Sequence, residues 1–463
     1  MTKQPPKSKR TQKNVKISSM VLVEDERERA IVEAALRAFR DAKARLPKAR
    51  DPKASREAHS AIIALTDGVA QMVIAGAEDE AEEEEPDVVV IDGTVWRAAV
   101  TCAKTYHSIR GPLVVTRTLF RSKRNGPTRC FFEERRGIVG GIFTQDLGHL
   151  VVTGVADLPA TAARRLIEGA TGHRIATATM KRTAMSVGNE MRDSEEEFFK
   201  SVVDRLPIPE AARAIVVSVD ALSFNVRDEG YKQATAATIS LLDDEGNRLE
   251  TIRLGEMPEP GKATIMDRVE REVRSLVTRR PDLKTEVVVD GAPDLREHLQ
   301  ARFPFATHVT DFFHVVEHIS DALRHLPFDD ETRAAQRRSF CHRLKHEDNA
   351  ATEILRWLRD CRWVHRDRIS EAALDVIEGH ANYLENQLPF TDYASAANDN
   401  LDIGSGAVEA ACKTLVTQRL KISGAKWSRT GARAILYLRS LMQSSRISEA
   451  LDFHHQNRLK HAA

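Results

Sequence analysis

Hydrophobic residues near the start of the chain recur at helical spacing. Two such stretches, 24–46 and 55–76, have Pro47 and Pro52 between them. Apolar positions three and four residues apart place one hydrophobic stripe on each helix, and prolines end helices. The pattern therefore predicts a helical hairpin over 24–77.

The pattern then changes twice. Short runs rich in β-branched residues, with Asp92-Gly93 as a turn and a glycine-rich stretch behind them, predict a small β module over 88–155. Helical spacing returns over 156–195, where two segments are separated by a turn near Gly172. Two short helices around such a turn fit a helix-turn-helix that enters the major groove of DNA, and the alternative is two ordinary packed helices.

The stretch 213–325 has the clearest pattern. Two apolar, β-branched runs end at Asp220 and Asp290, and an amphipathic helix is predicted over 262–280. The run beginning at Thr307 starts as a strand and becomes helical near Asp311. The element order β-β-β-α-β-α-β-α predicts a ribonuclease-H-like α/β fold, whose first part covers 196–325.

The remaining chain reads as helical and increasingly basic. Residues 326–400 form polar helical segments, and 401–425 contain a loop followed by a helix with Glu409 in its first turn. Residues 426–463 are interpreted as a basic C-terminal tail.

Composition fits a folded protein of several domains. The chain has 463 residues, of which 42% are hydrophobic and 30% are charged. A sizeable core is available, and two to four domains are natural for this length.

The net charge of +1 hides a strong asymmetry. Residues 1–17 carry six Lys or Arg and no acid, residues 78–87 carry eight acids, and residues 413–463 carry ten Lys or Arg against two acids. We interpret 1–23 as a flexible basic arm and 78–87 as an acidic linker. Basic ends suit a polyanionic partner, and the alternative is a solvated surface.

The cysteines argue against a cross-linked or zinc-ribbon protein. Five cysteines lie far apart with no CxxC pair, so we expect no disulfide framework, no structural zinc and a reducing cytoplasmic location. No run approaches the length of apolar residues that a bilayer requires, which predicts no transmembrane helix and no membrane partner. The basic N-terminus lacks the apolar stretch of a secretory signal.

Three carboxylates are candidates for chemistry. Asp220 and Asp290 each close an apolar strand, where a carboxylate is costly unless it is compensated, and Glu409 begins a later helix. Such a cluster suits two Mg²⁺ or Mn²⁺ ions that clamp the attacking and leaving oxygens of a phosphodiester. Taken singly, each strand-end Asp also fits a turn or a helix cap.

A second pattern points to different chemistry. His314 and His318 enclose an HxxEH sequence, the zinc site of inverted-motif metallopeptidases. That site needs a distant third ligand, and nothing in 326–400 singles one out. The alternatives are that these histidines line the carboxylate site or pack on the surface.

Three segments together resemble a known family. They are VVVDGAPDL, THVTDFFHVVEHI and IGSGAVEAACKTLVTQRLKISGAKWSRTGARAILYLRSLMQSSR. Their combination is similar to bacterial insertion-sequence transposases of the DDE class, and most of all to the ISKra-type family. Relatives often have Gly after the first catalytic Asp, where this chain has Ala221, and many carry a CxxC zinc ribbon that this chain lacks.

The resemblance implies a ribonuclease-H-like core with Asp220, Asp290 and Glu409 as the metal-binding catalytic triad. It makes Asp311 and His314 a D-x-x-H motif of secondary role, and 326–400 a helical insertion. The expected activity is cleavage and joining of double-stranded DNA at the ends of an insertion sequence, by a homo-oligomer in the bacterial cytoplasm at the nucleoid. A domesticated or inactive relative that only binds DNA is the alternative.

Candidate DNA contacts come from two regions, the second predicted helix of 156–195 and the basic segment after Glu409. They are Thr179, Lys181, Arg182, Lys413, Arg419, Lys421, Lys426 and Arg429.

Overall fold

The computed structural model describes residues 23, 25–48, 51–83, 86–91 and 93–462. Except for Val23, the predicted basic arm lies outside the described residues. The chain divides into two compact units, Met1–Val89 with Val95–Arg129 (unit 1) and Val90–Thr94 with Cys130–Ala463 (unit 2). Both helices and a mixed sheet are present, so the fold class is α/β.

Unit 1 begins with the predicted helical hairpin, which is confirmed. Asp25 caps the first helix by accepting a hydrogen bond from the Glu28 backbone N–H at 2.8 Å. A three-stranded sheet follows, in the order β1-β2-β3. The elements are α1 (Glu26–Arg45), η1 (Leu46–Lys48), α2 (Pro52–Glu83), β1 (Val88–Ile91), β2 (Thr94–Ser108) and β3 (Gly111–Arg121).

The acidic run is not a linker through most of its length, because α2 continues to Glu83. Asp79 accepts a hydrogen bond from the Thr116 backbone N–H at 2.8 Å, and Glu82 accepts one from Thr118 N–H at 3.1 Å. Both donors belong to β3 and lie on the edge of this strand that does not face β2. The acids therefore hold α2 along the edge of the sheet.

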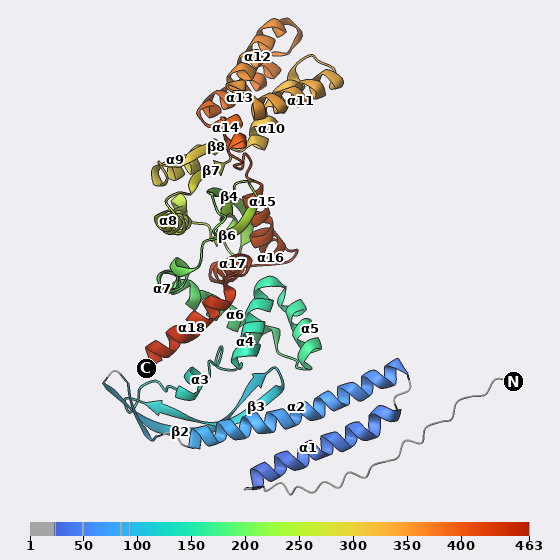
Figure 1. Cartoon of the computed structure of the whole chain (residues 1–463), viewed down its shortest axis with the longest axis vertical. Coiled ribbons are helices and arrows are strands. Elements are labelled where there is room, and N and C mark those ends of the chain that lie inside the picture. Colours follow the sequence, from blue (N-terminus) through green and yellow to red (C-terminus); the bar gives the residue numbers. More distant parts are fainter. Residues whose placement is uncertain (1–22, 24, 49–50, 84–85, 92, 463) are drawn as a thin grey trace, which may run out of the picture. The chain divides into compact units, whose positions relative to one another are not determined.

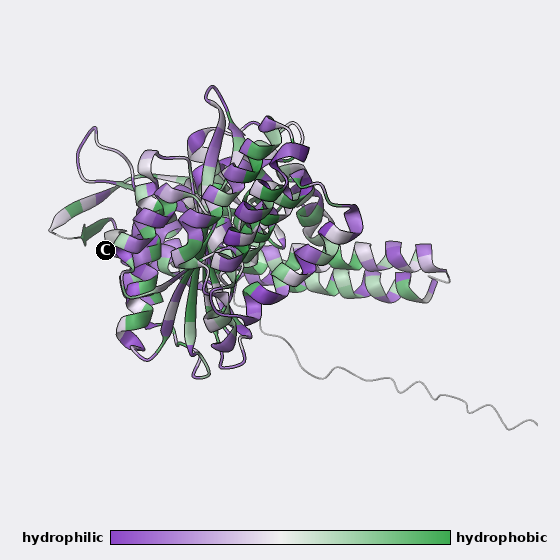
Figure 2. Cartoon of the chain, turned by 90° about the horizontal axis from the view of Figure 1, so that it is seen from above, coloured by the Kyte–Doolittle hydropathy of each residue, from purple (hydrophilic) through white to green (hydrophobic). Residues whose placement is uncertain are grey.

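The hairpin contains one helix that bears on the expectation of no transmembrane segment, which stays a prediction. One helix among the described residues, α2 over Pro52–Glu80, is long and apolar enough to span a membrane by length and composition alone. Isolated polar residues interrupt the apolar runs of this helix but leave it hydrophobic overall. The number of consecutive apolar residues therefore does not single out this helix. Ile63, Met72 and Val73 are exposed on this helix, and Figure 2 shows hydrophobic colour recurring along the hairpin.

The predicted β module ends earlier than expected. No strand among the described residues of 122–155 continues it, and two helices occur there instead, α3 (Phe131–Arg135) and α4 (Gln145–Asp157). The glycine-rich stretch is a tight turn in which Val139 and Phe143 form an isolated bridge. Gly140 and Gly141 have φ of 58° and 69°, so glycine makes the turn possible.

Two helices follow as predicted, α5 (Ala160–Thr171) and α6 (Thr177–Asp193), with Gly172 left-handed between them at φ 71°. The inner face of α6 is buried through Met180, Ala184 and Val187. DNA reading by α6 stays a prediction.

Unit 2 is built around a five-stranded sheet in the order β6-β5-β4-β7-β8. The antiparallel pairs are β4 with β5 and β5 with β6, and the parallel pairs are β4 with β7 and β7 with β8. The predicted element order is confirmed, with two short segments, α7 and η2, before it. The elements are α7 (Glu195–Ser201), η2 (Val203–Arg205), β4 (Ala214–Val226), β5 (Gly230–Leu242), β6 (Arg248–Glu256), η3 (Pro260–Lys262), α8 (Ala263–Arg279), β7 (Lys284–Val289), α9 (Pro293–Arg302), β8 (Thr307–Thr310) and α10 (Phe312–His325).

Side-chain alternation gives the sheet two covered faces. Val217 and Val287 belong to a core shared with α8 and α9, whereas Val216 and Val288 belong to a core shared with α10 and the helices after it. Farther along β4, Phe224 packs in the core that includes the helices after residue 405. Figure 1 shows α8 and α15 on opposite sides of the sheet.

Residues 326–400 are helical, as predicted, and join the core of α10. The loop and short helices of 401–425 follow. The elements are α11 (Asp330–His346), α12 (Ala350–Val364), η4 (Arg366–Arg368), α13 (Glu371–Gln387), η5 (Leu388–Phe390), α14 (Tyr393–Asn398), α15 (Gly406–Ala411), a π-helix η6 (Cys412–Thr417) and α16 (Gln418–Leu420).

The predicted basic tail is wrong. Residues 426–463 contain two packed helices, α17 (Arg429–Gln443) and α18 (Ile447–Ala462), and Ile435, Leu436 and Leu438 of α17 are almost fully buried. A count of charges along the sequence does not reveal this core helix, because its arginines form ion pairs with acids elsewhere in the chain. The pairs within α17 are Arg429–Glu229 at 2.6 Å, Arg433–Asp193 at 2.7 Å and Arg439–Asp157 at 2.8 Å, and Arg446, between α17 and α18, pairs with Glu272 at 2.7 Å.

A buried ion network joins α6, α7, β6 and α8. Glu195 pairs with Arg192 and Arg268 at 2.9 Å each and with Arg271 at 3.5 Å. Glu256 pairs with Arg192 at 2.8 Å and with Arg268 at 3.4 Å. Burial would raise the pKa of Glu195, but the surrounding guanidinium groups hold it below its ordinary value.

We expect Arg268→Met to lower the free energy of unfolding of unit 2 by about 3–5 kcal/mol, because it leaves buried carboxylates undercompensated. The control is Arg274→Met on the same helix, since Arg274 pairs with Glu270 on the surface, where a pair is worth about 1 kcal/mol or less. Urea unfolding followed by circular dichroism measures both variants. Equal losses would contradict a special role for the buried network.

A second buried acid differs from Glu195. Glu286 on β7 is fully buried, and neither of its carboxylate oxygens has a hydrogen-bond partner among the described residues. Burial, with Asp402 and Asp399 adding to it, raises the pKa of Glu286 from 4.5 to about 8. Between pH 4.5 and about 8, Glu286 therefore keeps a proton in the folded protein that it has released in the unfolded chain. The contribution of Glu286 to the free energy of unfolding falls as the pH rises through this range.

We expect Glu286→Gln to remove this dependence. The variant should match the wild type near pH 5 and exceed its stability by about 1–3 kcal/mol at pH 9, where the buried charge is costly. Glu297→Gln, at an exposed position on α9, is the control and should leave the pH profile unchanged. Parallel profiles for wild type and Glu286→Gln would refute the assignment.

Candidate active site

The two strand aspartates occupy matching positions on neighbouring parallel strands. Val217 of β4 is paired with Val287 of β7, and Asp220 and Asp290 each lie three residues farther along. Equal offsets along parallel strands predict that both side chains point to the same face of the sheet. Asp290 directly follows β7 as expected, but Asp220 lies within β4 rather than at its end, because β4 continues to pair with β5 as far as Val226.

The helix that carries Glu409 contacts β4 through Cys412, which lies one helical turn after Glu409. The Cys412 thiol donates a hydrogen bond to Asp220 Oδ2 at 3.6 Å. Burial and the nearby Asp220 and Glu409 carboxylates raise the pKa of Cys412 far above its ordinary value, so the thiol stays protonated. The structure thus brings Asp220 and the Glu409 helix together, and a π-helix begins at this cysteine, a feature frequent at functional sites.

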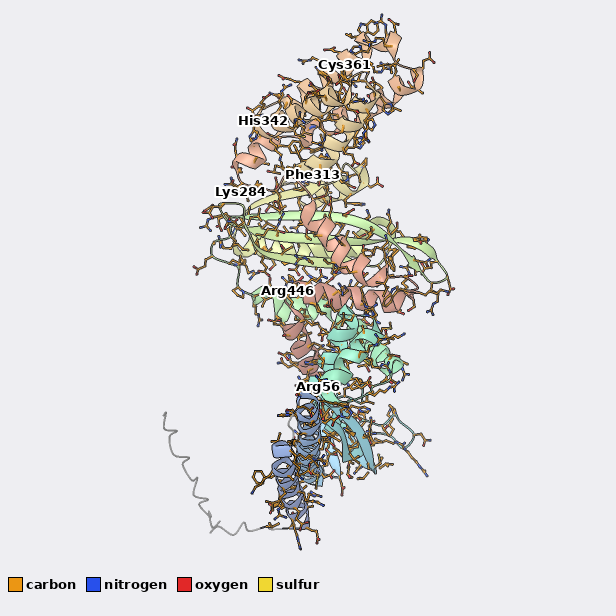
Figure 3. The ribbon with its side chains drawn as sticks, turned by 90° about the vertical axis from the view of Figure 1, so that its right-hand side faces the viewer. Arg56, Lys284, Phe313, His342, Cys361 and Arg446 are labelled. Atoms are coloured by element: carbon orange, nitrogen blue, oxygen red, sulfur yellow. The ribbon has the colours of Figure 1, made fainter. Side chains whose placement is uncertain are left out.

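Asp311 ties three chain segments to one buried carboxylate. Its backbone N–H donates to the Val289 carbonyl at 2.8 Å, next to Asp290. Its side chain accepts hydrogen bonds from the N–H groups of Phe313 at 2.6 Å, His314 at 3.1 Å and Ser405 at 2.5 Å. Asp311 therefore joins the end of β7, the start of α10 and the loop before the Glu409 helix. Figure 3 labels the exposed Phe313 at this junction.

The Asp311 carboxylate also favours the protonated form of His314. Burial would raise the pKa of Asp311, but the hydrogen bonds to it lower that pKa well below its ordinary value. His314 Nδ1 lies 3.6 Å from Asp311 Oδ1, an ion pair rather than a hydrogen bond. Asp311, against partial burial, raises the pKa of His314 to about 9, with Asp290 adding to the effect. His314 is therefore an imidazolium at neutral pH.

Tyr383 is a site neighbour that sequence patterns did not reveal. It lies on α13, and a Cβ at Gly291 would come within 2.4 Å of the Tyr383 hydroxyl. This contact explains the glycine after Asp290, and only the fold brings the two segments together.

His318, the second histidine of the HxxEH pattern, contacts residues of α13 rather than Asp311. The His318 ring stacks on Tyr383 at 3.6 Å between centroids, and His318 Nδ1 lies 2.9 Å from His380 Nδ1. Across the described residues, no group of three or more His, Cys, Asp or Glu is arranged to hold a metal ion. This applies to the HxxEH pattern and to the three carboxylates alike.

The carboxylates nevertheless fit a hard divalent cation chemically. Asp220, Asp290 and Glu409 supply oxygen donors, the ligands that Mg²⁺ and Mn²⁺ prefer. Like charges keep apart when no cation joins them. Asp220 and Asp290 are half-buried and Glu409 is exposed, so all three can reach a ligand.

The candidate DNA contacts separate into residues that are accessible to a ligand and arginines that are engaged in the fold. Lys181, Arg182, Lys413, Lys421 and Lys426 are exposed, and Thr179 is half-buried.

Two arginines are engaged elsewhere in the fold. Arg419 is 4% exposed and donates two hydrogen bonds to the Val155 carbonyl, at 3.2 and 3.0 Å. It therefore has a structural role, which corrects its assignment to phosphate. Arg429 is held by its bidentate pair with Glu229.

No protein-family model matches the sequence, and no curated protein matches it either.

We expect Asp311→Asn to return the pKa of His314 from about 9 towards its ordinary value of 6.5, because the neighbouring negative charge is removed. The amide keeps one acceptor oxygen, so the fold should survive. Histidine titration by NMR measures the shift, and His342 on α11, labelled in Figure 3, is the internal control. An unchanged His314 titration would contradict the ion pair.

Proposed function

We propose that this chain is a DNA transposase of the DDE class with a ribonuclease-H-like catalytic core. The observation that carries the proposal is the shared position of Asp220 and Asp290 on adjacent parallel strands, with the Glu409 helix tied to that face through Cys412. The strand order β6-β5-β4-β7-β8, antiparallel on one side of β4 and parallel on the other, supports such a core.

The proposed reaction has two steps at one phosphodiester site. Water first hydrolyses a strand at the end of the element and leaves a 3′-hydroxyl, and that hydroxyl then attacks a phosphodiester of target DNA and displaces its 3′ oxygen. Asp220, Asp290 and Glu409 would hold the divalent cations. When bound, Mg²⁺ or Mn²⁺ activates the attacking oxygen and stabilises the leaving one.

The remaining side chains prepare the site. His314 carries a positive charge beside Asp290, which offsets part of the repulsion among the carboxylates. The Asp311 carboxylate positions this imidazolium and the loop before Glu409, because it accepts hydrogen bonds from the backbone N–H groups of His314 and Ser405. The Cys412 thiol and the Ala221 backbone N–H each donate a hydrogen bond to one oxygen of Asp220, and a carboxylate oxygen has a second lone pair that can bind a cation.

The partner in this proposal is double-stranded DNA, both at the element ends and at the target. Pairing two ends requires at least a dimer, and the setting is the bacterial cytoplasm at the nucleoid. Imperfect inverted repeats in the DNA that flanks the gene would support the proposal independently.

We expect Asp290→Asn to abolish nicking and strand joining, with a fall of at least about 100-fold, since an amide is a poorer metal ligand than a carboxylate. Binding to the same end fragment should persist. A gel shift beside a nicking assay with Mg²⁺ compares the wild type with this variant.

The matched control is Asp294→Asn, an exposed acid at the start of α9, four residues after Asp290. It should leave nicking intact. Nicking by Asp290→Asn at the wild-type rate would refute the triad. Wild-type binding to the ends without any nicking would favour an inactive DNA-binding relative.

A further inference from the structure

A basic cleft lies in unit 2 between the starts of α5 and α6, the end of β4 and the loop before α17. Its volume is about 600 Å³. No Asp or Glu is among the described residues that line it, and its cationic residues are Lys181, Arg227, Arg419 and Lys426. A cleft of this size with charge of one sign favours an anionic ligand.

Two helices begin at this cleft without a capping side chain. The residues before them, Pro159 for α5 and Ala176 for α6, provide no side-chain acceptor for the first-turn N–H groups. In contrast, Ser428 caps α17 by accepting from Gly431 N–H at 3.1 Å. Uncapped first turns carry partial positive charge and bind phosphate groups readily.

Trp427 forms part of the wall of the cleft. It lines the cleft and is 7% exposed, and its indole N–H is buried without an acceptor among the described residues. Its backbone carbonyl accepts from Arg227 N–H at 2.8 Å, which attaches this loop to the end of β4. Arg419 lies over the Trp427 ring at 4.7 Å, so the wall of the cleft is fixed by buried contacts.

Three of the cations are available to a ligand. The side chains of Lys181, Arg227 and Lys426 are exposed and make no ion pair or hydrogen bond with the described residues. The arginines of α17 differ, since Arg433 and Arg439 are each paired with an acid. Unpaired cations gathered in one cleft leave their charge for an external anion.

We propose that this cleft binds backbone phosphates of the DNA on which the chain acts; the proposal rests on the function proposed above. The strand β4 connects the cleft to the carboxylates, since it runs from Asp220 to Val226, next to Arg227. Seven residues of extended chain span about 23 Å. Because DNA advances about 3.4 Å per base pair, a duplex that runs along β4 would have the bound phosphates about seven base pairs from the bond that is cut.

The first test measures binding of the full chain to a labelled 30-base-pair duplex over a range of salt concentrations. The variant is Lys181→Gln with Lys426→Gln. Loss of two phosphate contacts should weaken binding about tenfold at low salt and reduce the slope of log K against log salt by about two. The control is Arg338→Gln with Arg368→Gln, two exposed cations of the helical insertion, which should change neither.

The second test locates the contact by ethylation of phosphates on an end fragment. Ethylation about seven base pairs from the cut should block wild-type binding and have little effect on the Lys181/Lys426 variant. An unchanged salt slope, or an equal loss in the control, would overturn the proposal. Competition by inorganic pyrophosphate in the wild type alone, without any loss of DNA affinity in the variant, would assign the cleft to a small phosphorylated ligand instead.

The two proposals fail differently. Binding with the expected slopes but without Mg²⁺-dependent nicking would refute the catalytic function and leave the cleft as a DNA site. Nicking with an unchanged slope would refute the cleft alone. No binding of the duplex by the wild type would refute both.

Discussion

The buried carboxylate of Asp311 is the constraint on which the candidate site depends. A fully buried negative charge is stable only if donors and cations compensate it. Here three backbone N–H groups and the His314 imidazolium do so. Those donors come from α10 and from the loop at Ser405, while the Asp311 N–H fixes the end of β7. The positions of Asp290, His314 and the Glu409 helix are thereby coupled to one another.

Strand register provides the other half of the arrangement. Asp220 and Asp290 share a face because β4 and β7 are parallel and their equal offsets from a paired Val217 and Val287 preserve side-chain direction. The long antiparallel arm of β4 then continues beyond Asp220 to the basic cleft. A single strand thus connects the proposed chemistry with the proposed DNA contact, so the spacing between them is set by strand geometry.

Periodicity predicted the elements well wherever one face of an element is buried, as in the strand before Asp290 and the helix over 262–280. The predictions were wrong where a run of like charges was taken as a sign of an exposed segment. The C-terminal arginines are neutralised by partners far away in sequence, such as Glu272, and the acidic run caps a sheet edge through Asp79. The contacts of Tyr383 with Gly291 are likewise invisible without the fold, because only the helical insertion brings them together.

The central claim is that Asp220, Asp290 and Glu409 share divalent cations. Anomalous scattering from crystals of the full chain soaked in Mn²⁺ tests this most directly. We expect a peak about 2.0–2.6 Å from carboxylate oxygens of Asp220 and Asp290, with Glu409 drawn towards it and the peak lost in Asp290→Asn. Mn²⁺ bound only at other residues, or no Mn²⁺ at this edge of the sheet in crystals of a protein that still cuts DNA, would contradict the account.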